Sequence, residues 1–519
     1  MSHIDMEDFP PAGFRILDLF AGPGGLDVAA DVLGHQVTGI EWDAGACATR
    51  RAAGMNTFQG DVRRYRAAFF PYAQVLTGGP PCQTFTVAGH GAGRRSLDQV
   101  VEYIRRLHEA VRTGNQEWKE IFRTWRNISE ELRRKEIKAR DVKARKRTVE
   151  DLRAMKRKAL KLRLERLGNS AGEVKNLMKR FNDVPQNLEF PDDELDGLLK
   201  EFSDLNDEHA ALRSQLEELG DERTGLVLQP LWWVIERSRR PGSEPYEAVV
   251  LEQVPAVLPV WEEYAKVLAS LGYRTGTQLM YTEAFGVPQT RRRAVLMARL
   301  DRAALLDHLG LRPGDLPAVP ETHERYQPKG RPSPRAKATL TEPLPMEPSR
   351  APLEGAKAPW VPMETALRRA REIKPELPER PAFTVISNYG TGGVSDARGR
   401  RDHDAPSATI TGKVSRNRVV LKDTDTDLAR FLPAEAGVLQ TFPVAYPWEG
   451  NDVSQQIGNA VPPRLALHVL RHVLEPELNG EEARTRLKQA TADLEAWEPG
   501  EPVEIREHGD WKGHPLTGK

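Results

Sequence analysis

The chain has 519 residues, and its 75 Lys and Arg balance its 75 Asp and Glu, so the formal net charge is zero. This balance excludes a uniformly basic nucleic-acid coat protein, although charge can still be segregated along the chain. The two cysteines, Cys47 and Cys82, exclude a disulfide scaffold and a four-cysteine zinc site. No apolar run is long enough to predict a membrane span, and the acidic N-terminus lacks the apolar core of a signal peptide. We therefore expect a cytoplasmic protein that binds neither a membrane nor a metal.

Residues 1–92 alternate short apolar runs with helical patterns, which is typical of a sheet covered by helices on both faces. We expect strands at 15–20, 36–40 and 75–77 and helices at 26–34 and 44–53. This stretch is the first part of a predicted α/β domain.

Residues 93–223 are expected to form an insertion, because Gly and Pro become scarce there and charged residues dominate. Residues 121–180 carry 21 Lys and Arg against 8 Asp and Glu, whereas residues 181–220 carry 2 against 12. The acidic stretch also has the apolar spacing of a coiled-coil seam, at Leu195, Leu198, Phe202, Leu205, His209, Leu212, Leu216 and Leu219. We predict an antiparallel helical hairpin with one basic and one acidic arm. The alternative is a single charged helix with a disordered return.

The α/β pattern resumes at residues 224–301, the predicted second part of the first domain. Strands are expected at 249–254 and 293–300, with a helix at 261–271 between them.

Residues 302–425 predict a smaller, β-rich domain. An irregular, Pro-rich stretch at 311–362 precedes the runs AFTVIS, SATIT and RVVL, of which the first two are similar enough to suggest related strands. Residues 426–478 are expected to return to the first domain with a helix at 455–474. Residues 479–519 are expected to form a polar, mobile tail.

A glycine-rich loop at Phe20–Gly25 follows the first predicted strand and opens the first predicted helix. Glycines there let a ligand approach the backbone closely, and the helix N-terminus offers free N–H groups. Glu41 ends the next strand, where a carboxylate can accept hydrogen bonds from ribose hydroxyls. Trp42 can stack on an adenine, and Asp61 can face the adenine edge. This order predicts a site for an adenosine-containing cofactor; the alternative is an ordinary strand–helix turn with Glu41 and Asp61 as surface caps.

A second loop, Gly78–Gln83, follows the strand predicted at 75–77. Its two glycines and two prolines fix a rigid backbone and place Cys82 at the carboxyl edge of the sheet, where open α/β sheets bind ligands. Cys82 is therefore a candidate nucleophile, because a thiolate is a strong one. Cys47 lies among alanines in a predicted helix, so we expect it to be a small buried residue.

Together these loops resemble those of the cytosine-C5 DNA methyltransferase family, of the bacterial or phage type. The first two of the segments that resemble the family are DLFAGPGG and GGPPCQ. Four further segments follow in the family's order: LEQVPAVL at 251–258, PQTRRR at 288–293, QTFP at 440–443 and QQIGNAVPP at 455–463. Six segments in one order are far more specific than any one of them, and they cover most of residues 14–92, 226–300 and 404–475.

The resemblance implies an α/β, Rossmann-like S-adenosylmethionine-dependent methyltransferase domain with a mixed sheet. It also implies that residues 302–425 are a target-recognition domain and that the substrate is double-stranded DNA in a bacterial or phage-infected cell. The implied cofactor, S-adenosylmethionine, would be bound by Phe20, Gly22, Gly24, Glu41, Trp42, Asp61, Pro80 and Asn459. The implied catalytic residues are Cys82, Glu252, Arg291 and Arg293.

The implied chemistry is covalent catalysis, which divides one difficult step into two easier ones. Cys82 would add to cytosine C6, and Glu252 would donate a hydrogen bond at N3, for which its carboxyl would need a raised pKa. Arg293 would bind the O2 side of the base, and Arg291 would position the Cys82 loop. The alternative for Gln289, Arg291 and Arg293 is a solvated edge. Asn459 fits a structural brace near the cofactor better than a catalytic group.

Two departures from the family bear on geometry. Gln253 stands where the family has an Asn that is expected to brace the loop, so the local loop geometry is in question. The insertion falls in the segment that closes over DNA in the family. Its basic arm would either contact DNA phosphates or pair with the acidic arm, leaving the hairpin at about 115–220 to bind another protein or another copy of the chain. The near-cancelling charges favour the second.

Recognition of the target is expected in the smaller domain, where basic residues accompany β-rich runs, at Arg398, Arg400, Arg401, Lys413, Arg416 and Arg418. Generic solubilising charge is the alternative for half of them. Two other functions stay open: an RNA cytosine-C5 methyltransferase, and a catalytically silent DNA-binding scaffold assembled through the hairpin.

Overall fold

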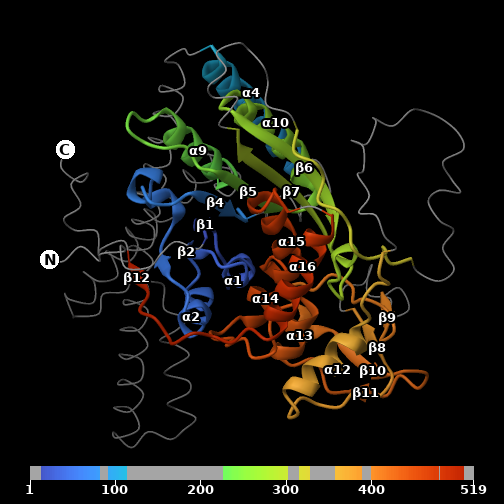
Figure 1. The fold of residues 1–519 in the computed structure, drawn as a ribbon. Coiled ribbons are helices and arrows are strands. Elements are labelled where there is room, and N and C mark those ends of the chain that lie inside the picture. The colour runs from blue at the N-terminus through green and yellow to red at the C-terminus, as the bar shows by residue number, and fades with distance from the viewer. Residues whose placement is uncertain are drawn as a thin grey trace, which may run out of the picture. The chain divides into compact units, whose positions relative to one another are not determined.

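The structure, a computed structural model, describes residues 13–81, 92–113, 226–301, 315–327, 357–387, 399–478 and 480–507 (Figure 1). The chain divides into two units, one of residues 1–115 with 223–519 and one of residues 116–222, and all described residues belong to the first. The helical hairpin expected at 115–220 therefore lies outside the described residues. Within the described ranges, no helix is long and apolar enough to cross a membrane.

The first unit is built around a mixed eight-stranded sheet with the order β12-β3-β2-β1-β4-β5-β7-β6. The first six strands in that order are parallel, whereas β7 is antiparallel to both β5 and β6. The strands span β1 Arg15–Leu19, β2 Gln36–Glu41, β3 Thr57–Gln59, β4 Val75–Gly78, β5 Ala248–Gln253, β6 Tyr273–Tyr281, β7 Arg292–Leu300 and β12 Arg506–Glu507. The predicted mixed sheet is thus confirmed.

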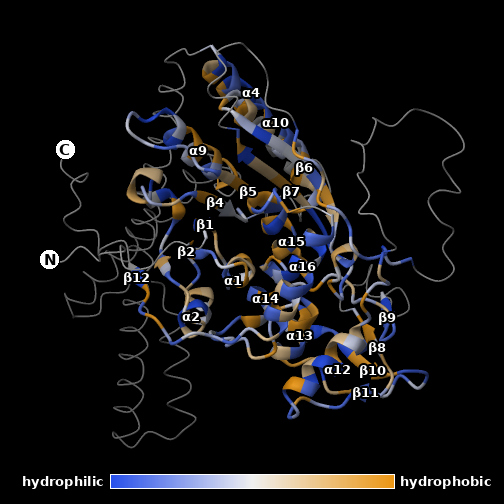
Figure 2. Cartoon of the chain, viewed as in Figure 1, coloured by the Kyte–Doolittle hydropathy of each residue, from blue (hydrophilic) through white to orange (hydrophobic). Residues whose placement is uncertain are grey.

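Helices cover the sheet and bury its apolar residues. They span α1 Gly25–Val32, α2 Ala44–Ala52, α4 Ala92–Arg112, α9 Gln229–Arg239, α10 Leu258–Ser270, α14 Val453–Asn459, α15 Pro463–Leu474 and α16 Gly480–Glu495. One hydrophobic cluster joins α1, α15 and α16 to β1, β5 and β7, while α10 packs on β6, β7 and α4. Figure 2 shows both hydrophobic and hydrophilic residues along these helices, as a helix with one buried face requires.

The boundary expected at residue 93 falls inside α4, and α4 packs on the sheet's own helix α10. Ile104 and Leu107 are buried, and Arg105 Nη2 lies 3.1 Å from Glu263 Oε1 on α10. The many charged residues of α4 made its buried face hard to recognise in the sequence. The prediction therefore assigned this helix to the insertion that follows.

A second, antiparallel sheet forms the smaller lobe, with the strand order β11-β10-β8-β9. Its strands are β8 Phe383–Ile386, β9 Arg400–Asp402, β10 Arg418–Leu421 and β11 Asp427–Leu428, and the helices α12 Met363–Ile373 and α13 Pro433–Leu439 pack beside it. Its core includes Phe383, Val419 and Leu367.

The run SATIT at 407–411 forms no strand, contrary to expectation, and only an isolated bridge joins Ser407 to Gln289. Its backbone groups are bound by the segment before β7 instead. Thr290 N donates to Ser407 O at 2.8 Å, and Ile410 N donates to Gln289 Oε1 at 2.7 Å. Side-chain and loop partners therefore take the hydrogen bonds that a sheet neighbour would have made.

The residues after 478 differ most from the expected polar tail. Helix α16 buries Ala483, Leu487, Ala490 and Leu494 against α15 and α1. Beyond it the chain returns to the N-terminal elements, where β12 pairs in parallel with β3 (Figure 1). The sequence of this helix shows few large apolar residues, because alanines fill half of its buried face.

We predict that Leu487→Ala lowers the free energy of unfolding by about 2–4 kcal/mol, because it removes a side chain that is buried in the core cluster shared with α1 and α15. Lys488→Ala, on the exposed face of the same helix, is the matched control and should change it by less than about 0.5 kcal/mol. Urea unfolding followed by circular dichroism measures both. Equal, small effects would mean that α16 is not part of the cooperative core.

Candidate active site

The candidate site lies along one edge of the large sheet. Strands β1, β4 and β5 end at this edge, and β7 begins there because it runs antiparallel to β5. The loops after β1 and β4 and the first residues of β7 therefore come together, although they are far apart in the sequence.

The glycine loop after β1 has a special backbone. Phe20 has a φ of 60°, Gly22 of 55° and Gly24 of 102°, a region that favours glycine. A Cβ on Gly24 would lie 2.3 Å from Met55 Sδ, and one on Gly25 would lie 2.0 Å from the Val461 carbonyl oxygen. A Cβ on Gly22 would meet nothing within 4 Å. Gly24 and Gly25 thus serve packing, whereas Gly22 alone faces open space where a ligand can approach.

Glu41, at the end of β2, ties two loops together. Its carboxylate accepts hydrogen bonds from the backbone N–H groups of Gly22 at 2.7 Å, Trp42 at 2.8 Å and Asp43 at 2.7 Å. Burial raises the pKa of this carboxyl, although these three hydrogen bonds oppose the shift. A carboxylate has about four acceptor positions, so about one remains for a ligand. The sequence predicted a contact between Glu41 and a ribose, but it did not predict that Glu41 also holds the glycine loop in place.

Trp42 directly follows Glu41, and Asp61 lies in the loop after β3. Trp42 is 48% exposed, so its ring is accessible for stacking. Asp61 is buried and begins a 3-10 turn, accepting from Arg63 N at 2.9 Å and from Arg63 Nε at 2.9 Å. A ligand's amino group would have to share this carboxylate with Arg63.

Asp18 is a buried acidic residue that sequence reasoning missed. It lies in β1 beneath the glycine loop, and Thr77 Oγ1 on β4 donates to its Oδ1 at 2.6 Å. Burial, reinforced by the nearby carboxylate of Asp27, raises its pKa well above the usual value. Asp27 is itself paired with Arg50 on α2. The signal was an acidic residue in an otherwise apolar strand.

The second loop lies beside the end of β5. Glu252 Oε1 is 2.5 Å from Arg293 Nε, and a Cβ built on Gly79 would lie 3.8 Å from Glu252 Oε2. Gln253 Nε2 donates to the Pro80 carbonyl, and Gln253 Oε1 accepts from Val254 N. Gln253 therefore braces the loop directly before Cys82. Cys82 itself lies outside the described residues.

Gln289 and Arg291 are fully buried, which excludes a solvated edge for them. Arg291 donates to the carbonyls of Ile410 and Gly458, both at 3.0 Å, and of Ala460 at 3.2 Å. Burial lowers its pKa well below the usual value for arginine. These described contacts are with the smaller lobe and the α14–α15 turn, rather than with the loop before Cys82.

Gln289 and Gln440 extend this arrangement. Gln289 Nε2 donates to Gln440 Oε1 at 2.6 Å, and Gln440 Nε2 donates to the Ile457 carbonyl at 2.7 Å. We call Gln289, Arg291 and Gln440 the buried clamp. Two glutamines at these positions were visible in the sequence, but their mutual contact was not.

Asn459 ends α14 and is exposed, and its side chain accepts from Gln455 Nε2 at 3.0 Å. In the smaller lobe, Arg400 pairs with Asp425, and Arg418 pairs with Asp427 at 2.8 Å. Arg401 stacks on Tyr326 with its guanidinium carbon 4.7 Å from the ring centre. Arg398 lies outside the described residues. The described basic residues of this lobe are therefore not uniformly free for DNA.

Cys47 is buried, as expected, and burial raises the pKa of its thiol to about 12. Its Sγ lies 3.6 Å from the Glu41 carbonyl oxygen. Among the residues that the structure describes, no group of three or more His, Cys, Asp or Glu could hold a metal ion.

Comparison with known proteins agrees with this arrangement. Residues 14–111 and 246–475, more than half of the chain, match the family described as C-5 cytosine-specific DNA methylase. The chain belongs to this family. The match ends before α16 and β12, so these elements lie outside what the family model matches.

Two curated relatives are similar over short stretches. Type II methyltransferase M.HhaI of Haemophilus parahaemolyticus is 32% identical over 91 residues, which are 17% of this chain and 28% of the relative. Type II methyltransferase M.AquIA of Picosynechococcus is 28% identical over 113 residues, 19% of this chain and 44% of the relative. The matches thus span less than half the length of either relative.

Among solved structures, the Dnmt2 methyltransferase of S. pombe is similar, with 14% identity and a TM-score of 0.42. The match covers 90% of this chain and 100% of that one.

We predict that Cys47 stays unmodified when the folded protein is treated with iodoacetamide at pH 8, because its raised pKa leaves almost no thiolate at that pH. Mass spectrometry of the digest measures the modification. In guanidinium chloride the pKa returns toward about 8.5 and the same cysteine should react fully. Rapid labelling in the folded state would contradict its burial.

Proposed function

We propose that the chain transfers a methyl group from S-adenosylmethionine to C5 of a cytosine in a specific sequence of double-stranded DNA. The observation that carries this proposal is the convergence of Glu252, Arg293 and Gln253 on the loop that leads into Cys82. Family membership supports the same reaction. Two carboxyl-edge loops, one for the cofactor and one for the nucleophile, then lie on neighbouring strands.

The residues around the glycine loop fit S-adenosylmethionine. Gly22 faces open space, Glu41 keeps about one acceptor position for a ribose hydroxyl, and Trp42 offers an exposed ring for the adenine. We assign Phe20, Pro80 and Asn459 to the walls of this site and Asp61 to the adenine edge, whereas Gly24 supports the loop through its close packing on Met55. When bound there, the cofactor supplies an activated methyl group.

The chain's own residues then act on the cytosine. The Cys82 thiolate adds to C6 and makes C5 nucleophilic, so that C5 takes the methyl group. A water molecule then accepts the C5 proton, and the C6–S bond breaks to release the Cys82 thiolate. Glu252 carries the proton at N3, and Arg293 both holds this carboxyl and binds the O2 side. Arg291 is a positioning residue and does not touch the base. The buried clamp fixes the start of β7, and this sets the position of Arg293.

The base cannot be reached inside a duplex, so it must be extruded into this edge, at a cost of a few kcal/mol. We assign recognition of the flanking sequence to the smaller lobe within residues 302–425. We also assign residues 115–220 to binding of another protein or another copy of the chain. A soluble, cytoplasmic location accompanies this proposal.

We predict that incubation with methyl-labelled S-adenosylmethionine and an unmethylated duplex places label in 5-methylcytosine at one short motif. Cys82→Ala should abolish turnover while cofactor affinity, measured by calorimetry, stays within about twofold, because the thiol adds to the base and does not bind the cofactor. Nucleoside analysis followed by sequencing of the modified positions measures the product. Cofactor affinity that falls together with activity would overturn the assigned role of Cys82.

Label found in RNA and not in DNA would instead indicate the RNA methyltransferase. Sequence-specific DNA binding without label in either nucleic acid would indicate the silent scaffold.

We predict opposite behaviour for two neighbouring glycines. Gly22→Ala should fold, at a cost of about 1–2 kcal/mol for its left-handed backbone, but should weaken S-adenosylmethionine binding at least tenfold because its methyl group enters the open space. Gly24→Ala, the matched control, should chiefly lower the melting temperature, because its Cβ meets Met55. Calorimetric titration and thermal unfolding separate the two effects. Unchanged affinity in Gly22→Ala would remove this loop from the cofactor site.

A further inference from the structure

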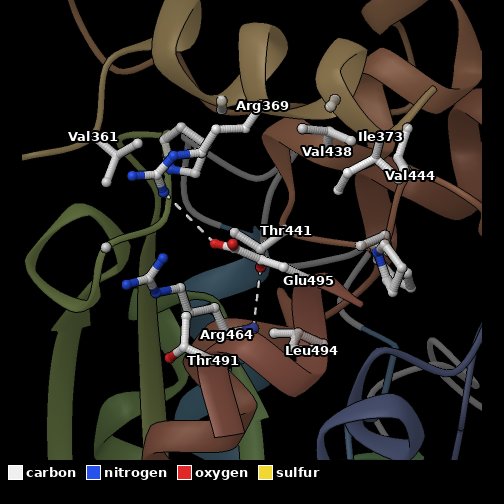
Figure 3. Close-up of a pocket in the computed structure, with 16 residues that line it drawn as sticks. Val361, Arg369, Ile373, Val438, Thr441, Val444, Arg464, Thr491, Leu494 and Glu495 are labelled. Atoms are coloured by element: carbon white, nitrogen blue, oxygen red, sulfur yellow. Dashed lines mark hydrogen bonds and ion pairs between the residues drawn. The ribbon is translucent and has the colours of Figure 1, made fainter. Parts of the chain in front are cut away.

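A cavity of about 80 Å³ lies where α12 of the smaller lobe faces α13, α15 and α16 (Figure 3). Its wall also includes Gly286 and Pro288 from the segment before β7. Helix α16 lies beyond the family match, which ends at residue 475. The cavity is therefore partly built by a part of this chain that lies outside the family match, and its wall includes no residue of the cofactor loop or of the described part of the Cys82 loop.

One side of the cavity is charged. Arg369 on α12, Arg464 on α15 and Glu495 on α16 all line it, and Figure 3 shows their charged ends on the same side. Arg369 Nη1 lies 3.7 Å from Glu495 Oε1. Two guanidinium groups thus face one carboxylate, and the charged residues of the wall leave one positive charge without a counterion.

Among the described residues, Arg464 shares the carboxylate of Glu495 with Arg369 and has no counterion of its own. Its Nε is buried and has no hydrogen-bond partner among the described residues, and burial lowers its pKa. The guanidinium still stays charged at neutral pH. A Cβ on Gly286 would lie 2.7 Å from Arg464 Cζ, so the missing side chain of Gly286 makes room for this guanidinium. A buried charge that must share its counterion is costly, and an anion beside it would lower that cost.

The other side of the cavity is apolar. Ile373, Val438, Val444 and Leu494 line it, and Figure 3 places Ile373, Val438 and Val444 opposite Arg464. Ile373 is 58% exposed, so this wall opens toward solvent. A bare inorganic anion would satisfy the charge but would leave this apolar wall in contact with water. A carboxylate with a short aliphatic chain would satisfy both sides.

We propose that this cavity is a binding site for a small organic monocarboxylate with a short aliphatic chain. The carboxylate binds the Arg464 guanidinium, and the chain packs on the apolar wall. The pairing is charge-assisted and the planar guanidinium suits a carboxylate. The site is independent of methyl transfer, so its test needs no enzyme activity.

The experiment titrates the full-length protein with butyrate by calorimetry and by ligand-observed NMR at constant ionic strength. We expect saturable binding, whereas butyramide, which has the same shape and no charge, should bind at least about tenfold more weakly. Inorganic phosphate should also bind more weakly, because it makes no use of the apolar wall. Equal binding of phosphate and butyrate would overturn the assigned ligand class, and no saturable binding of butyrate would overturn the site.

Two exposed variants give a test with opposite signs. Arg369→Gln removes one positive charge and should weaken butyrate binding about two- to fivefold, whereas Glu495→Gln removes the competing carboxylate and should strengthen it by a similar factor. Both variants break the same ion pair. A purely structural effect of losing that pair would therefore change the affinity in the same direction in both, and that result would contradict the proposal.

Arg464→Met tests the central contact and should weaken butyrate binding at least about tenfold. Circular dichroism and thermal unfolding establish that the variant is folded. Arg371→Gln is the matched control, because Arg371 lies on the same helix as Arg369, pairs with Glu379 and does not line the cavity. Affinity unchanged in a folded Arg464→Met, or lowered equally in Arg371→Gln, would overturn the assignment.

Discussion

The buried guanidinium of Arg291 joins three parts of the chain that are remote in sequence. It lies directly before β7, and its donors reach carbonyls at 410, 458 and 460. A guanidinium in the interior needs hydrogen-bond acceptors, because an arginine does not give up its proton, and both Nη groups of Arg291 find them in these carbonyls. The smaller lobe and the turn between α14 and α15 are therefore held where those carbonyls meet Arg291. The position of Arg293, two residues further on, follows from this constraint.

The strands and helices around the two glycine loops were predictable, because each is a short apolar run followed by a loop with its own signal. The resemblance to the family was visible in the sequence alone, since six segments occur in the family's order. The contacts that hold the site together were less accessible. Glu41 was visible as an acidic residue at a strand end, but its bonds to three backbone N–H groups depend on the curvature of a loop that only the folded chain has.

The wrong predictions of a strand at 407–411 and of a polar tail after 478 have a common cause. The structure of each segment depends on contacts with residues that are distant in sequence. Ser407 and Ile410 have the composition of a strand, but their hydrogen bonds are made with Thr290 and Gln289. Helix α16 looks polar, and its small alanines matter only because α15 and α1 lie close enough to bury them. Local patterning does not report such partners.

Gln253 shows how a substitution can preserve a function by a different geometry. Its side chain is one methylene longer than the Asn of the family, and both of its polar ends are occupied. The amide nitrogen reaches Pro80, while the oxygen folds back to the next backbone N–H at Val254. The extra length is thus absorbed locally, and the loop before Cys82 keeps a brace from β5. The concern raised by the sequence departure is answered for the residues up to Pro81.

The packing of α16 and β12 on the N-terminal elements also determines the order in which the fold can be completed. Trp497 Nε1 donates to Asp31 Oδ2 across 466 residues, and Arg486 donates to the Leu33 carbonyl across 453. Contacts of such long range are slow to form, because closing so long a loop costs conformational entropy before the contact stabilises the fold. While a ribosome is still translating the smaller lobe, α1 has no α16 to cover it. A nascent chain therefore carries an exposed apolar surface near its beginning for most of its synthesis, and it needs protection from aggregation during that time.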